Sequence, residues 1–192
     1  RNGMGKSTTI SSILGMMSRV EGKIEFAGTS IISIPSHNIA RQGIGLVPEG
    51  RRVFPNLSVL ENLTAASTSG PWGLQQVYNL FPKLEERSKQ SASTISGGEQ
   101  QMLVIARALM TNPKLLILDE ATEGLAPVIR QEIWEAIHKL KDEGISILIV
   151  DKTLKELLAL SDNCFILERG ETVWSGIPSN LTTNIADKYL GV

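Results

Sequence analysis

Apolar residues follow two patterns along the chain. Short and nearly unbroken apolar runs, at 44–47, 115–118 and 145–150, are typical of strands whose two faces are covered in a parallel sheet. Longer segments between these runs have helical spacing. The clearest is an apolar stripe in segment 96–111, formed by Met102, Ile105, Ala106, Leu109 and Met110. Strands that alternate with helices in this way predict an α/β fold with a mostly parallel sheet.

Local signals predict where the other elements begin and end. Pro127 suits the first position of a helix and Gly144 the residue after its end, so a helix is expected from Pro127 to about Glu143. The stretch 54–113 has a helical pattern and is expected to form an inserted helical subdomain. The remaining expected elements are a helix from Gly5 to about Met17, a turn and short strand in 21–28, short helices in 34–42, in 154–162 and at the chain end, and a hairpin of 164–168 with 171–176 around Arg169–Gly170.

Composition narrows the class of protein. The 192 residues are 42% hydrophobic, which is ordinary for a globular protein of one domain. The 19 basic and 20 acidic residues nearly cancel, so nothing suggests a surface that binds nucleic acid. A single cysteine excludes a disulfide within the chain. The apolar runs are far shorter than the roughly 20 residues that span a bilayer.

The first stretch, RNGMGKSTT (1–9), contains most of a phosphate-binding loop of the form GxxxxGK[ST], whose leading glycine would stand one position before Arg1. Glycines at Gly3 and Gly5 allow the backbone to turn its N–H groups toward an anion, and the following helix start favours negative charge. Lys6 would reach the β- and γ-phosphates, and the Ser7 hydroxyl would ligate Mg²⁺. The alternative is a glycine-rich turn with an exposed lysine.

Two acidic residues, Asp119 and Glu120, end the apolar strand LLILDE (115–120). Ligands of parallel α/β sheets bind at the carboxyl ends of strands. Successive side chains of a strand diverge, so the two carboxylates are expected to have different roles. Asp119 would hold Mg²⁺, and Glu120 would orient or deprotonate an attacking water. The alternative is a solvated acidic pair.

A second anion site is predicted in TISGGEQQ (94–101). The Ser96 hydroxyl and the N–H groups of Gly97 and Gly98 stand at the start of the helix with the apolar stripe. The alternative is a simple capping box, in which Ser96 and Glu99 cap each other's backbone. Both interpretations are compatible.

Together these motifs resemble the nucleotide-binding subunits of ABC transporters, and the resemblance covers essentially the whole chain, 1–192. The motifs that carry it are the phosphate loop, the [LI]SGG[QE] signature and the strand ending in DE. The segments VPEGRRVFPNLSVLENL (47–63) and EGLAP (123–127) look like the branched-chain amino-acid importer subfamily, in particular its second ATPase subunit. The expected fold is therefore a P-loop NTPase with a helical signature subdomain. The ending YLGV is also similar, so the C-terminus is expected to be complete.

The resemblance implies a mechanism. Two ATPase subunits, identical or different, close head to tail around two ATP molecules with Mg²⁺, and each signature meets the partner's ATP. Glu49 stands where many relatives have glutamine, and Phe54, Pro55 and Leu57 would lie near the surface that contacts two membrane permease subunits. The implied residues are Asn2, Gly3, Met4, Gly5, Lys6, Ser7, Thr8 and Glu49 for nucleotide, Ser96, Gly97, Gly98 and Glu99 for the partner's ATP, Ser7, Asp119 and Glu49 for metal, and Glu120 and Lys152 for catalysis.

The resemblance also implies a place in the cell and indirect partners. The subunit would lie peripherally on the cytoplasmic face of the inner (plasma) membrane. A periplasmic or extracellular binding protein would act on it indirectly, and nucleic acid would not be a partner.

The chain departs from the family pattern at three positions. Relatives have Ala-Asp ten residues after the switch histidine, and here Ser161-Asp162 place Lys152 in the histidine's position. As a cation, Lys152 is still able to reach a γ-phosphate. Ala121 replaces the usual proline after the acidic pair, and Ala126 replaces the aspartate of the D-loop, as in the subfamily.

Three other functions compete with amino-acid import. Urea or amide importers have similar ATPase subunits. A non-transport ABC ATPase is disfavoured because no coiled coil separates Glu49 from the signature and only one cassette is present. A non-hydrolysing regulatory module is disfavoured by the intact Lys6, Asp119 and Glu120. Because the sequence starts inside the phosphate loop, it is expected to be an N-terminal truncation without the first strand, which binds ATP poorly and aggregates in isolation.

Overall fold

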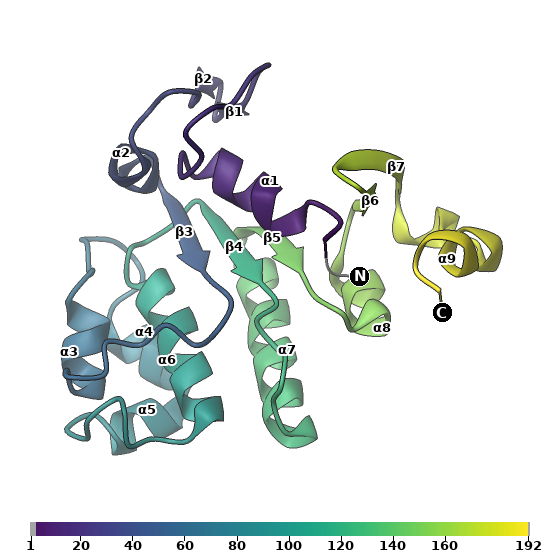
Figure 1. Cartoon of the computed structure of the whole chain (residues 1–192). Helices are drawn as coiled ribbons and strands as arrows, with labels where there is room; N and C mark the ends of the chain where they lie inside the picture. Colours follow the sequence, from purple (N-terminus) through teal and green to yellow (C-terminus); the bar gives the residue numbers. More distant parts are fainter. Residues whose placement is uncertain (1–2, 192) are drawn as a thin grey trace. The chain divides into compact units, whose positions relative to one another are not determined.

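The computed structural model describes residues 3–191 (Figure 1). The chain divides into two compact units. One is Ala40–Asp151, and the other combines the chain up to Ile39 with Lys152–Val192.

A parallel sheet forms the centre of the Ala40–Asp151 unit. Its strands are β3 (Ile44–Val47), β4 (Leu115–Asp119) and β5 (Ser146–Val150), in the order β3-β4-β5. Val47 pairs with Leu118, and Asp119 with Val150, so the carboxyl ends of all three strands lie at the same end of the sheet. The residues that come after the strands at this end include Glu49 after β3, Glu120 after β4 and Asp151 after β5.

The helices of this unit are α3 (Val59–Thr64), α4 (Leu74–Leu80), α5 (Pro82–Glu86), α6 (Gly97–Leu109) and α7 (Pro127–Asp142). α6 contacts β3, α3, α5 and α7, and Figure 1 shows α3, α4 and α5 gathered beside it. The predicted stripe on α6 is buried at every position, which confirms it as core. The predicted helical stretch 54–113 is interrupted between α4 and α5. Pro82 lacks an N–H and disfavours helical backbone at Phe81, so the helix restarts there.

β5 is less covered than its apolar sequence predicted. Ser146 is exposed and the other four residues of the strand are half-buried, whereas Leu116–Leu118 of β4 are fully buried. An edge position alone does not explain this, because β3 is also an edge strand of this three-stranded sheet and is mostly buried. β3 packs against helix α6 in addition to its partner strand β4.

The second unit contains α1 (Lys6–Ile13), a hairpin of β1 (Glu25–Phe26) and β2 (Thr29–Ser30), α8 (Leu154–Leu160), the antiparallel pair β6 (Cys164–Glu168) and β7 (Glu171–Gly176), the short 3-10 helix η1 (Pro178–Asn180) and α9 (Thr183–Tyr189). The helix α2 (Ser36–Arg41) crosses the boundary between the units. The β6–β7 turn is at Arg169–Gly170, as predicted, and both residues have positive φ.

α1 ends at Ile13, four residues before the expected Met17. Gly15 has φ +63, and a Cβ built there would lie 2.6 Å from the carbonyl oxygen of Ile34. The chain therefore turns at the one residue type that fits both this backbone conformation and this close contact. Within the described part of the chain, no helix is both long and apolar enough to cross a membrane.

Candidate nucleotide-binding site

The phosphate loop has the backbone that its glycines predicted. Gly3 has φ +74 and Gly5, the N-cap of α1, has φ +97. The first turn of α1 contains no acidic residue, and the N-cap has no side chain to cap it. The first N–H groups of a helix have no partner within the helix, so they are available to an anion such as a phosphate. Asn2 lies outside the described residues.

The side chains that would bind nucleotide come from the start of α1. Ser7 and Thr8 are exposed, and Lys6 is half-buried. The Thr9 N–H donates to the Gly5 carbonyl at 2.9 Å and begins the helical ladder. The residue types and the glycine backbone together fit the phosphates of a nucleotide.

A contact that the sequence did not reveal holds the phosphate loop. The Gly170 N–H in the β6–β7 turn donates to the Met4 carbonyl at 3.0 Å, and a Cβ on Gly5 would lie 2.9 Å from the Gly170 Cα. Two features therefore favour glycine at position 5: its positive φ, and the close approach of the β6–β7 turn, which leaves no room for a Cβ. The dipeptide Arg169–Gly170 predicted the turn, but no local signal predicted what it contacts.

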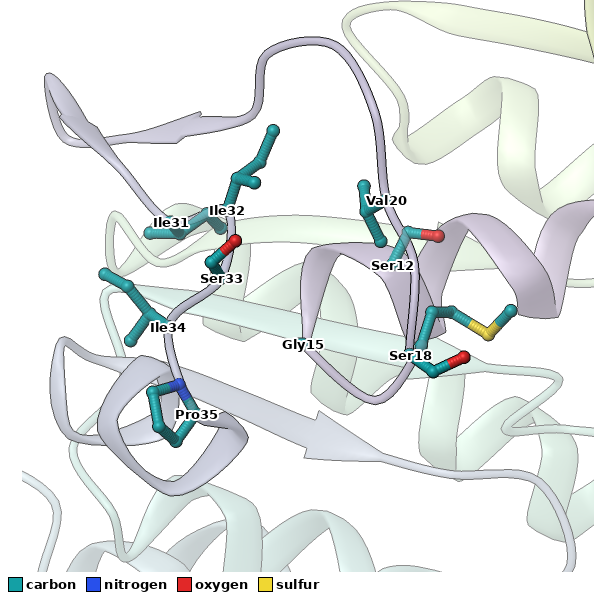
Figure 2. Close-up of a pocket in the computed structure, with 10 residues that line it drawn as sticks. Ser12, Gly15, Ser18, Val20, Ile31, Ile32, Ser33, Ile34 and Pro35 are labelled. Atoms are coloured by element: carbon teal, nitrogen blue, oxygen red, sulfur yellow. The ribbon is translucent and has the colours of Figure 1, made fainter.

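A pocket of about 240 Å³ in the same unit is separate from this loop (Figure 2). It lies at the far end of α1 from Lys6, and its lining includes Ser12, Gly15, Ser33 and Pro35. None of the candidate site residues lines it, so it is not the phosphate site.

Asp119 and Glu120 differ in their surroundings, as their position at the end of a strand predicted. Asp119 is the last residue of β4 and is 8% exposed, and Glu120 is half-buried. Glu120 has φ +49 and donates its N–H to the Val150 carbonyl at 2.8 Å. The backbone therefore turns sharply between the two carboxylates.

The carboxylate oxygens of Glu49, Glu120 and Glu123 lie within 4.8 Å of one another. Glu49 was among the expected metal residues, whereas Glu123 was not singled out. Carboxylate oxygens are the ligands that Mg²⁺ prefers, so the donor set fits this ion. Of the other two expected metal ligands, Asp119 lies in the same unit as these glutamates, and Ser7 lies in the unit that contains α1.

The signature residues form a capping box at the start of α6. The Ser96 hydroxyl accepts from the Glu99 N–H at 3.2 Å, and the Ser96 N–H donates to Glu99 Oε2 at 2.8 Å. Burial raises the pKa of Glu99, but hydrogen bonds from Ser96 and the charge and hydrogen bond of Arg87 outweigh it, so the net pKa is lowered. Ser96 itself is exposed. The capping-box interpretation is confirmed, and binding of an anion by the same residues stays a prediction.

Arg51 joins the signature to the turn after Glu120. Its Nη2 donates to the Gly124 carbonyl at 2.9 Å, and a Cβ on Gly97 would lie 2.2 Å from its Nη1. A residue with a Cβ at position 97 would therefore displace the Arg51 guanidinium from its place beside Gly97. Gly98 is buried against Ile129, where a Cβ would be 2.6 Å from Cγ2. Sequence motifs did not indicate either contact.

Lys152 is exposed and directly follows the last residue of the Ala40–Asp151 unit. Its carbonyl accepts from the Leu154 N–H at 3.1 Å. Phe54 and Pro55 are exposed and Leu57 is half-buried, so two of these three predicted contact residues present their side chains to solvent.

A glycine-rich loop at a helix start and carboxylates at the end of a parallel strand define the class of P-loop nucleotide-binding proteins. Comparison with known proteins narrows this class. A family model described as ABC transporter matches residues 1–123. The branched-chain amino acid transport ATP-binding protein BraG of Pseudomonas aeruginosa is 44% identical over 197 residues, covering 99% of this chain and 84% of that protein. LivF of Archaeoglobus fulgidus, a probable ATP-binding protein of the same kind of transport, is 36% identical, covering 94% of this chain and 79% of its own length.

Solved structures agree with the sequence comparison. An ATP-binding cassette of an ABC transporter in its ADP conformation has a TM-score of 0.82 at 26% identity, covering 100% of this chain and 85% of that one. The chain therefore belongs to the ABC transporter family, as an ATP-binding subunit that couples ATP hydrolysis to transport.

Proposed function

We propose that this chain powers the uptake of branched-chain or related amino acids. The observation that carries the proposal is the 44% identity to BraG across nearly the whole chain. The lipopolysaccharide export protein LptB of Escherichia coli is also similar over the same span, but at 32%. This difference favours an importer of amino acids over an exporter.

The chain's own residues supply the binding of ATP. The backbone N–H groups of the loop 3–8 and the Lys6 ammonium hold the β- and γ-phosphates, since the N–H groups at a helix start carry partial positive charge and the ammonium a full one. Ser7, Asp119 and Glu49 are the residues that would hold Mg²⁺. When bound, this ion neutralises part of the phosphate charge.

Glu120 acts on the attacking water. Its carboxylate accepts a hydrogen bond from the water and aligns the oxygen with the γ-phosphorus, so the proton has an acceptor as the new bond forms. Lys152 contributes a positive charge to the γ-phosphate. The Ser96 hydroxyl and the N–H groups of Gly97 and Gly98 bind the ATP of a second subunit.

To pass its motion to the permease subunits, the ATPase subunit needs a surface that contacts them. The exposed Phe54 and Leu60 lie near each other in sequence and are 46% and 37% exposed, which suits an apolar contact with a permease subunit. Arg107, on the signature helix α6, stacks on the Phe54 ring at 4.2 Å from its centroid. A shift of α6 on ATP binding would therefore move this surface. The subunit would act at the cytoplasmic face of the membrane with two permeases.

The central test is Glu120→Gln in the assembled transporter. The variant removes the acceptor charge but keeps the shape, so we expect it to bind ATP normally, stall as a closed dimer and lose about 100-fold or more in turnover. Glu135→Gln, at an exposed position on α7, is the matched control and should hydrolyse at the normal rate. Rapid hydrolysis by Glu120→Gln would assign the base role to another residue.

The substrate is tested separately by uptake into vesicles that hold the subunit with its permeases and binding protein. We expect ATP-dependent accumulation of labelled leucine that excess valine or isoleucine inhibits and urea or acetamide does not. Accumulation of labelled urea without leucine uptake would replace the proposal by amide import.

A further inference from the structure

The turn that carries Glu120 has an unfavourable backbone conformation. Glu120 is not a glycine, yet its φ is +49, in the left-handed region. This region costs a residue with a Cβ about 1–2 kcal/mol. A conformation of this kind persists only where surrounding contacts determine it. The contacts around the turn therefore decide where the Glu120 carboxylate points.

Val150, the last residue of β5, and the following Asp151 contact the backbone of Glu120 and the loop after it. The Val150 carbonyl accepts the Glu120 N–H at 2.8 Å. Thr122 comes two residues after Glu120. It donates to Asp151 Oδ2 from its hydroxyl at 2.7 Å and from its N–H at 3.3 Å. Thr122 is 3% exposed and Asp151 is half-buried. One carboxylate oxygen thus holds both the side chain and the backbone of Thr122.

Burial makes the Thr122 bond costly to lose. A buried hydroxyl without a partner is penalised, and hydrogen bonds to a charged acceptor are stronger than neutral ones. The bond also spans a large separation in sequence, from the loop after β4 to the end of β5. The Thr122–Asp151 bond therefore fixes the loop after β4 relative to the sheet, which a bond within the loop would not do.

We propose that Asp151 is a positioning residue for ATP hydrolysis, which holds the Glu120 carboxylate in line with the attacking water through Thr122. This inference rests on the proposed role of Glu120. Asp151 does not contact the reacting atoms in this assignment. Loss of its bond releases the turn, and a small displacement of a catalytic group is enough to slow a reaction strongly.

The experiment compares Thr122→Val, Thr122→Ser and Asp151→Ala in the assembled transporter ATPase, with Glu120→Gln as the reference for complete loss. Thr122→Val keeps the shape and the backbone N–H bond and removes only the hydroxyl. We expect its kcat to fall about tenfold while its KM for ATP changes less than about twofold. Thr122→Ser retains the hydroxyl and should return kcat to within about twofold of the original chain.

Coupling between the two residues is measured with the double variant Thr122→Val/Asp151→Ala, which we expect to be no slower than Asp151→Ala alone. Thr111→Val removes a comparable hydroxyl bond, to the Ala108 carbonyl at 2.7 Å, and is the matched control with normal kcat. Because Asp151→Ala is the variant with the greater risk of misfolding, Thr122→Val is the decisive one.

Three results would overturn the inference. The first is a kcat of Thr122→Val within about twofold of the original chain. The second is a fall in kcat accompanied by an equal rise in KM and a lower Tm that Thr122→Ser does not reverse. The third is additive losses in the double variant. In each case, slow ATP hydrolysis by Glu120→Gln still supports the proposed function. Fast hydrolysis by that variant instead shows that Glu120 is not the base.

Discussion

The buried amide of Asn62 is the structural support of the exposed Phe54 surface, and its removal gives the most quantitative prediction. Asn62 lies on α3 and is 0% exposed. Its Oδ1 accepts from the Phe54 N–H at 2.8 Å and from Arg107 Nη1 at 3.1 Å. Its Nδ2 donates to the carbonyls of Phe54 and Ser58, each at 3.0 Å.

The cost of Asn62→Ala depends on which partners keep another bond. The Phe54 carbonyl also accepts from the Leu57 N–H at 3.1 Å, and the Ser58 carbonyl from the Asn62 N–H at 2.9 Å, so both stay paired. The Phe54 N–H and Arg107 Nη1 lose this partner. Both bonds are part-buried, and a buried group left without its bond costs about 1–3 kcal/mol. Burial removes the Arg107 guanidinium partly from water and thereby lowers the pKa of this group.

The net effect is a loss of about 3 kcal/mol in the free energy of unfolding, because the better helix propensity of alanine returns roughly 0.6 kcal/mol. With a urea m value of about 2 kcal/mol/M, the midpoint falls by about 1.5 M. Trp72 and Trp134 lie in the same unit as Asn62, and Trp174 in the other. A Trp174→Phe background therefore makes tryptophan fluorescence report on this unit.

Asn79→Ala is the matched control, because Asn79 is an exposed residue on helix α4. We expect it to move the midpoint by no more than about 0.25 M, since surface substitutions stay within about 0.5 kcal/mol. An equal shift for Asn62→Ala and Asn79→Ala would refute the reasoning from unpaired groups.

Two further predictions concern the signature helix and Lys152. The Glu99 pKa is lowered from 4.5 in the folded chain, so its cap stabilises the fold above that value and is lost as pH falls through the lowered pKa. Between about pH 6 and about pH 3, urea titrations should therefore show a larger loss of stability for the original chain than for Glu99→Gln, and parallel curves would contradict this. Lys152→Ala should lower ATP turnover of the assembled transporter about tenfold if its ammonium reaches the γ-phosphate, and unchanged turnover would make it only a loop cation.

Elements with strong end signals were predicted correctly from the sequence. α7 runs from Pro127, as expected, and Gly144 follows with φ +88. Errors arose where a contact or a single residue overrode the pattern. The turn at Gly15 fits under the Ile34 carbonyl and ends α1 early. The apolar run of β5 gave no sign that most of its residues are only half-buried.

The sequence by itself determined the chemical groups of the site, because each motif places its groups within a few adjacent residues. The glycine backbone around Lys6, the carboxylates of Asp119 and Glu120 and the cap at Ser96 all follow from such local spacing. Only the tertiary structure decided which distant segments hold these groups. Gly170 meets the phosphate loop, Arg51 lies against Gly97, and Asp151 holds Thr122. These contacts depend on strand order and register and on the paths of loops, which no short stretch of sequence encodes.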